Sequence, residues 1–132
     1  MTLPYQTSPA TTFIAARIQD LAYRKSQAEI AAETGFPNPN MMTFLKTGKN
    51  KVPLDRVPSL AKALEVDPAY LMRLALDQAV GETAAKAITD IFGSPATVNE
   101  HGWLAEIRDA SGNSDPRLTA RSRSALRAIF GK

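Results

Sequence analysis

The fold is decided by residues 26–48, which read SQAEIAAETGFPNPNMMTFLKTG. Ser26 followed three residues later by Glu29 is the capping-box pattern, in which each of the two side chains pairs with the other residue's backbone amide at a helix start. The alanines and isoleucine that follow continue a short helix, and Gly35 is placed where a helix end favours a positive φ. The first half of this stretch therefore predicts a helix of about two turns.

A second helix start follows directly. Asn38 is a suitable N-cap, and Pro39 would occupy the first helical position, where a missing N–H costs nothing. Met42 and Leu45 are three residues apart and are expected to point inward, and Gly48 closes the segment. The whole stretch predicts two short helices joined by a tight turn.

The residues before this stretch predict one helix after a loose start. Residues 1–12 contain two prolines and five serines or threonines, and we expect a flexible arm there. Apolar residues then recur at helical spacing, which predicts a helix over about 12–25 with Thr11 or Thr12 as its cap.

The residues after it continue the helical pattern. A lysine-bearing loop over 49–53 leads to a helix over about 55–65, and Asp67-Pro68 opens another that runs to about Gln78. No segment alternates with period two, so strands are not supported. We therefore expect an all-α fold whose first part is a domain of five short helices.

The pattern of apolar residues after position 81 predicts three more amphipathic helices, over about 82–92, 97–109 and 118–130. The expected organisation is an arm (1–12), a helical domain (13–78) and a C-terminal helical extension (79–132) for dimerisation or partner binding. Trp103 is expected to anchor the C-terminal helices. His101, the single histidine, has no ligand partners at suitable spacing and is interpreted as structural or surface.

Composition narrows the class of protein. The absence of cysteine excludes a disulfide framework, a thiolate nucleophile and cysteine-ligated zinc. The start lacks the pattern of a signal peptide, and no apolar run approaches the ~18–20 residues of a membrane span. We expect a cytoplasmic protein with no membrane partner. The net charge of +3 is compatible with a polyanionic partner.

A two-turn helix, a glycine-ended turn and a second short helix form a helix-turn-helix. The segment 13–76 resembles the phage repressor and Cro family, also called Xre-type helix-turn-helix proteins. The resemblance is carried by Ser26, Gln27, Ile30 and Ala31, by Gly35, by Gly48-Lys49, by the helix pattern over 54–66, and by the Asp67-Pro68 start. Two features depart from the family: the turn is one residue longer, and Lys46 stands where a glutamate is frequent.

The resemblance implies two sets of DNA-contacting side chains. Those facing the major groove would be Asn40, Met41, Thr43 and Phe44. Those contacting phosphates would be Gln27, Lys46, Lys49, Asn50 and Lys51. A carboxamide can pair with adenine N6 and N7, apolar side chains suit thymine methyl groups, and lysines that neutralise phosphates release counterions.

Plainer readings of the same residues stay open. Met41 and Phe44 could belong to the core, the three lysines could form a solvated loop, and Gln27 could be an ordinary first-turn residue. Residues 117–132 hold five basic residues and no acid. They could form a dimerisation or core helix, contact the DNA backbone, or dock on an acidic protein such as RNA polymerase.

The expected function is sequence-specific binding of double-stranded DNA by a bacterial or phage transcriptional regulator. Its recognition helix, about 39–47, would enter the major groove, and a homodimer would read an inverted repeat. The alternative is a helix-turn-helix used for protein interaction, as in a coactivator that bridges to polymerase or an antitoxin. An enzyme is the least favoured class, because the sequence shows no nucleophile–base pair, glycine-rich phosphate loop or metal cluster. We expect no catalytic residue, no metal and no cofactor.

Overall fold

The computed structural model describes residues 2–93 and 96–132. These residues form helices and no strand, which confirms the predicted all-α class. The α-helices are α1 (Pro9–Leu21), α2 (Gln27–Thr34), α3 (Asn40–Thr47), α4 (Val57–Leu64), α5 (Pro68–Val80), α6 (Glu82–Phe92), α7 (Val98–Ala110) and α8 (Ala120–Ile129), and one 3-10 turn, η1, covers Leu54–Arg56. The chain divides into two compact units, Met1–Gly93 and Ser94–Lys132.

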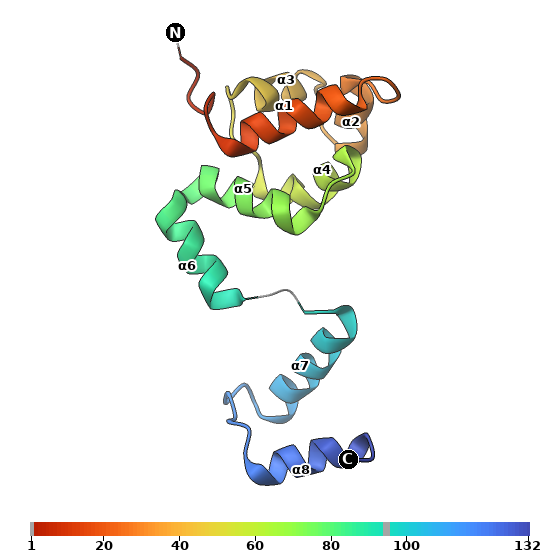
Figure 1. The fold of residues 1–132 in the computed structure, drawn as a ribbon, viewed down its shortest axis with the longest axis vertical. Helices are drawn as coiled ribbons and strands as arrows, with labels where there is room; N and C mark the ends of the chain where they lie inside the picture. Colours follow the sequence, from red (N-terminus) through yellow and green to blue (C-terminus); the bar gives the residue numbers. More distant parts are fainter. Residues whose placement is uncertain (1, 94–95) are drawn as a thin grey trace. The chain divides into compact units, whose positions relative to one another are not determined.

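The first unit has one hydrophobic core, to which α1 to α5 contribute. Helix α1 packs on α3 and α5, α2 packs on α4, and α4 packs on α5 (Figure 1). The largest fully buried side chains come from all five helices: Ile14, Leu21, Ile30, Met42, Leu45, Leu60, Leu64, Leu71, Val57 and Thr34. Helix α6 packs on α5 and buries only Ala85, so the first unit extends beyond residue 78, where the sequence placed the end of its helical domain.

Capping interactions fix where α2, the first helix of residues 26–48, begins and ends. The Ser26 hydroxyl accepts from the Glu29 amide at 3.1 Å, and the Glu29 carboxylate accepts from the Ser26 amide at 3.3 Å. Gly35 ends α2 with φ 87°, a left-handed conformation that glycine adopts without strain. The Asp67 side chain likewise caps α5 by accepting from the Ala69 amide. These three predictions are confirmed.

The predicted start of the first helix is wrong by three residues. Helix α1 begins at Pro9, because proline suits a first helical position, and Ser8 takes the N-cap position. Thr11, expected as a cap, is buried inside the helix, and Thr12 also lies within it. The expected arm of residues 1–12 is therefore shorter, and α1 ends at Leu21 rather than near residue 25.

Two further helix starts differ in detail. Helix α3 begins at Asn40, with Pro39 in the N-cap position, and the Asn38 side chain accepts from the Asn40 amide at 2.9 Å. Asn38 therefore caps from one residue further out than predicted. The segment expected as one helix over 55–65 begins as the 3-10 turn η1 and becomes α4 at Val57, with Pro58 in its first turn.

Charged side chains clamp the carboxyl end of α4, where backbone carbonyls lack helical partners. Arg17 donates from Nε to the Leu64 carbonyl at 2.7 Å, and Lys25 donates from Nζ to the Ala63 carbonyl at 2.8 Å. Glu65, which ends α4 with φ 59°, accepts from both terminal nitrogens of Arg24 and forms an ion pair with Lys25. The hydrogen bonds from Arg24, and then from Lys25, lower the pKa of Glu65 to about 2.

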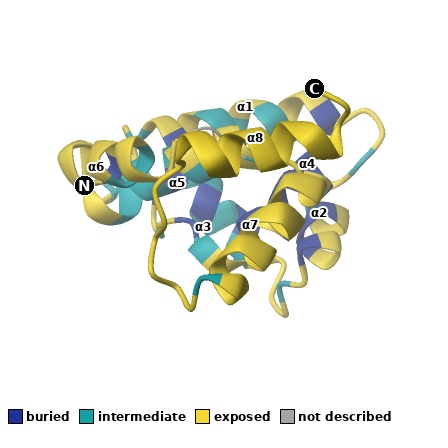
Figure 2. Cartoon of the chain, turned by 90° about the horizontal axis from the view of Figure 1, so that it is seen from below, coloured by how far each residue is buried: buried dark blue, intermediate teal, exposed yellow. Residues whose placement is uncertain are grey.

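The second unit consists of α7 and α8 joined by a loop, and we refer to residues 97–132 as the α7–α8 hairpin. Capping boxes at Thr97–Glu100 and Thr119–Ser122 start the two helices. Every residue of 96–132 is exposed or half-buried (Figure 2). Trp103 contacts Phe130, with ring centroids 5.9 Å apart, but it remains 46% exposed. The expectation that Trp103 anchors a core in this region is therefore wrong, because α7 and α8 alone do not enclose it.

In the part of the chain that the structure describes, no helix combines the length and apolar character needed to cross a membrane.

The hydrogen bonds and the ion pair of Glu65 with Arg24 and Lys25, here called the Glu65 clamp, predict how the free energy of unfolding depends on pH. Because the pKa of folded Glu65 is about 2, below its ordinary value of 4.5, its stabilising contribution is complete above pH 4.5 and is lost as the pH falls toward 2. Urea denaturation of the wild type and of Glu65→Gln should give a difference in free energy of unfolding that is largest near neutral pH and shrinks toward pH 2. Glu82→Gln, which removes an exposed carboxylate on α6, is the control. A Glu65→Gln difference that stays constant across this range would contradict the clamp.

Candidate nucleic-acid interface

Helix α3 packs against the rest of the first unit through one face. Met42 and Leu45 are fully buried, as predicted, and α3 packs on α1 and α2. Asn40 is exposed, and Met41, Thr43 and Phe44 are half-buried. Neither Met41 nor Phe44 is among the side chains that pack against the core cluster. All four predicted base-reading residues therefore lie outside the core, and the core reading of Met41 and Phe44 is not supported.

Phe44 joins α3 to the basic loop that follows it. The Lys49 ammonium lies over the Phe44 ring, 4.3 Å from its centroid, in a cation–π arrangement. The backbone amides of Lys49 and Asn50 both donate to the Phe44 carbonyl, at 3.0 and 3.2 Å. The structure thereby brings one predicted base-reading residue and two predicted phosphate-contacting residues into a single contact.

Gln27 is attached to α3. Its Nε2 donates to the Thr43 hydroxyl at 2.6 Å, across the turn that joins α2 and α3. The bond links a predicted phosphate-contacting residue with a predicted base-reading residue. It fixes the orientation of the Gln27 carboxamide and leaves its carbonyl oxygen and second N–H for another partner.

Lys46, Lys49 and Lys51 form the basic border of α3. Lys46 lies in the last turn of α3 and is half-buried, whereas Lys49 and Lys51 are exposed in the loop. Asn50 is half-buried between them. A border of three cations beside an outward helix face is suited to an anionic surface.

The loop that carries these lysines is fixed by Gln78 from α5. The Gln78 side-chain oxygen accepts from the Val52 amide at 2.7 Å, and its Nε2 donates to the hydroxyls of Ser8 at 3.2 Å and Thr11 at 3.3 Å. Val52 itself is buried. Sequence reasoning treated Gln78 only as a helix end, because its partners lie 26 to 70 residues away in the chain.

The segment before α1 also borders this surface. The Tyr5 amide donates to the Gly48 carbonyl at 2.8 Å. A shallow groove here is lined by Pro4, Tyr5, Met41, Lys49, Asn50, Lys51 and Pro53. The sequence analysis did not identify Pro4 and Tyr5 as residues of this surface. The one sequence feature that relates to them is Gly48, because only a residue without a side chain fits beside the backbone of Tyr5. A Cβ at that position would collide with the backbone of Tyr5 and Gln6.

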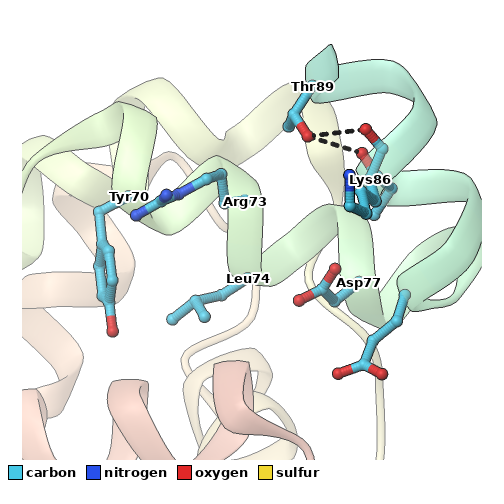
Figure 3. A pocket seen from close by; sticks show the side chains of 8 residues that line it. Tyr70, Arg73, Leu74, Asp77, Lys86 and Thr89 are labelled. Carbon is cyan, nitrogen blue, oxygen red and sulfur yellow. Dashed lines mark hydrogen bonds between the residues drawn. The ribbon is translucent and has the colours of Figure 1, made fainter.

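A second hollow, of about 420 Å³, lies between α5 and α6 (Figure 3). Its charged side chains balance, with Arg73 and Lys86 against Asp77 and Glu82. Arg73 lies over the Tyr70 ring at 5.6 Å, and the Thr89 hydroxyl donates to carbonyls of its own helix. This balance of charge does not favour an anionic ligand, in contrast to the border of α3.

The structure shows no cluster of three or more metal-ligating side chains within 2–93 and 96–132, and His101 is exposed on α7.

Comparison with known protein families, with curated proteins and with solved structures finds no match to this chain.

Gly48 and Gly35 allow a matched test of the packing of the N-terminal segment. Both have φ near 88°, so an alanine at either position should cost about 1–2 kcal/mol of unfolding free energy for its backbone conformation alone. A Cβ at Gly35 would meet only the mobile end of Arg56, at 2.9 Å, whereas at Gly48 it would meet backbone. Gly48→Ala should therefore cost a further ~1–3 kcal/mol, measured by urea denaturation. An equal loss of unfolding free energy in the two variants would show that the backbone of Tyr5 and Gln6 does not pack against Gly48.

Gln78 gives a test of how the loop is fixed. Gln78→Leu leaves the buried Val52 amide without its acceptor, which should cost about 1–3 kcal/mol of unfolding free energy and speed amide exchange at Val52. Gln78→Glu keeps the acceptor oxygen and should preserve protection of Val52. Asp77→Asn, at the preceding position, serves as the control. Unchanged exchange at Val52 in Gln78→Leu would contradict this role.

Proposed function

We propose that this protein binds double-stranded DNA in a sequence-specific manner and regulates transcription. In this proposal α2, the turn and α3 act as a helix-turn-helix, and α3 is the recognition helix that enters the major groove. The observation that carries the proposal is the division of α3: Met42 and Leu45 bury one face, and Asn40, Met41, Thr43 and Phe44 lie outside the core. A recognition helix needs this division, because its outer residues must reach base edges.

The basic border supports the same assignment. Lys46, Lys49 and Lys51 follow the outer face of α3, where phosphates on either side of a major groove would lie. The cation–π contact with Phe44 holds Lys49 beside α3, so its charge is placed before any ligand arrives. Such contacts give affinity without sequence information, whereas the outward residues of α3 would give the preference.

Gln27 acquires a more specific role in this proposal. Its bond to Thr43 couples the start of α2, where backbone amides favour an anion, to the reading face of α3. Gln27 would therefore contact a phosphate through its free N–H while it orients the Thr43 hydroxyl. Pro4 and Tyr5, beside the groove at Lys49 and Lys51, would lie at the edge of the same surface.

The finer family assignment also belongs to this proposal. In this proposal helices α1 to α5 would be the repressor-like five-helix domain, and α6, which packs on α5, would be an addition to it. The expected homodimer on an inverted repeat, with two recognition helices one DNA turn apart, about 34 Å, is the corresponding assembly.

A second candidate is a bridging role, in which the second unit docks on another protein such as RNA polymerase. The basic helix α8 and the exposed apolar side chains of the hairpin favour it. A bridging protein needs only weak binding of DNA that is indifferent to sequence, whereas a regulator needs a clear preference.

Two sets of substitutions on a panel of defined duplexes separate these roles. Asn40→Ala with Thr43→Ala should reduce the preference among duplexes, by about 1–3 kcal/mol for each lost base contact. Thr12→Ala with Gln19→Ala, which removes two exposed polar side chains of α1, is the matched control and should leave the preference unchanged. A preference that is unchanged in the Asn40/Thr43 variant would contradict the assigned reading face.

Lysine removal tests the phosphate contacts. Lys49→Gln with Lys51→Gln should weaken binding equally for all duplexes and lower the slope of log affinity against log salt by about one for each lysine. Lys62→Gln, an exposed lysine on α4, is the control for the loss of charge. A salt slope equal to that of the wild type would exclude Lys49 and Lys51 from the interface.

A further inference from the structure

We propose that the α7–α8 hairpin is a self-association surface, and that its occupant is the same hairpin of a second copy of this chain. Together the two hairpins would form an antiparallel four-helix bundle. This inference supplies the interface of the dimer in the proposed function, but its evidence does not involve DNA.

The hairpin carries more apolar surface than it can cover. Eight large apolar side chains are 38–87% exposed: Val98, Trp103, Leu104, Ile107, Leu118, Leu126, Ile129 and Phe130. Aromatic side chains bury about 150–250 Å² each when covered. The exposed apolar area is thus of the same order as the roughly 800 Å² that each partner buries in a standard interface.

The two helices are also too short to stand alone. Helix α7 has 13 residues and α8 has 10, and isolated helices below about 12–15 residues are marginal in water. The Trp103–Phe130 contact joins their apolar faces without burying either ring. Further burial is needed to hold the hairpin together, and a partner that packs on this face provides it.

The apolar residues form a stripe on each helix. Trp103, Leu104 and Ile107 are spaced at one and three residues on α7. Leu126 and Ile129 of α8 and its C-cap Phe130 show the reverse spacing, at three and one residues. This spacing places each set on one face of its helix, as in the core positions of a bundle. A groove-shaped partner is not required, since two such hairpins can cover one another.

Charge identifies a second copy as the occupant. Helix α7 carries Glu100, Glu106 and Asp109 against Arg108, whereas α8 carries Arg121, Arg123 and Arg127 and no acid. A two-fold interface brings the same surface of both chains together, so α7 of each chain can lie against α8 of the other. The opposite charges of the two helices are then satisfied twice.

Other occupants fit these charges less well. A nucleic acid would pair with the arginines of α8 but would leave Leu126, Ile129 and Phe130 in water. An acidic protein would be repelled by the carboxylates of α7. A second copy covers the apolar stripes and pairs both signs of charge.

Sedimentation equilibrium of the full chain, without DNA, tests the proposal. The wild type should be a dimer at micromolar concentration. Reversing charge beside the apolar stripe of α8 (Arg123→Glu with Arg127→Glu) should raise the dissociation constant by roughly tenfold or more, because each α8 would then face the acidic α7 of its partner. Reversing two lysines outside the hairpin (Lys62→Glu with Lys86→Glu) is the matched control and should leave the constant unchanged.

A complementary variant makes the test independent of any loss of folding. Reversal beside the apolar stripe of α7 (Glu106→Arg) should also weaken self-association, and mixing it with the α8 variant should restore a heterodimer. A monomeric wild type, including one whose hairpin folds back on its own chain, would overturn the proposal. So would a dimer that both reversals leave intact, or a mixture that fails to pair. None of these results depends on DNA, so the proposed function stands or fails separately.

Discussion

Two buried side chains, Met42 and Leu45, attach α3 to the first unit, and the remainder of the candidate interface depends on that attachment. Because only this face is buried, Asn40, Thr43 and Phe44 are left outside the core. The helix has just eight residues and would not persist alone in water, so its contacts with α1 and α2 maintain it. The outer face is therefore positioned by the core behind it.

Three hydrogen bonds, here called tethers, also hold this surface in position, and each joins α3 or the loop after it to a different part of the chain. Gln27 binds Thr43 from α2, Gln78 holds the amide of Val52 from α5, and Tyr5 binds Gly48 from the N-terminal segment. They are hydrogen bonds of 2.6 to 2.8 Å to positions on both sides of the lysine-bearing border. A surface fixed from three directions loses less conformational entropy when it binds a rigid ligand, and this favours affinity.

The two units contrast in how they are stabilised. The first has a continuous core and a charged clamp on the end of α4, whereas the second buries none of its described side chains. The large apolar residues of α7 and α8 are instead arranged in stripes beside opposite charges. In the proposed dimer such a unit would gain its stability from its partner, so self-association and the order of the second unit would be coupled.

Sequence reasoning succeeded where the causes are local. The capping box at Ser26, the left-handed Gly35 and the Asp67 cap depend on residues within about four positions of one another, so they can be read in the sequence. The buried pair of α3 followed from helical spacing. The tethers from Gln78 and Tyr5 could not be predicted, because they join positions 26 to 70 residues apart and depend on packing. Trp103 was misjudged for a related reason, since burial of an aromatic residue depends on a covering partner that the sequence does not show.

The proposed function requires that the outer face of α3 reads a DNA sequence. The most direct measurement is selection of duplexes bound by the full chain from a random pool, with the stoichiometry determined on the enriched duplex. The enriched duplexes should contain an inverted repeat whose half-sites are about 10–10.5 base pairs apart, centre to centre, or a multiple of that spacing, with two chains bound to each duplex. A pool that stays random after repeated selection would contradict the proposed function.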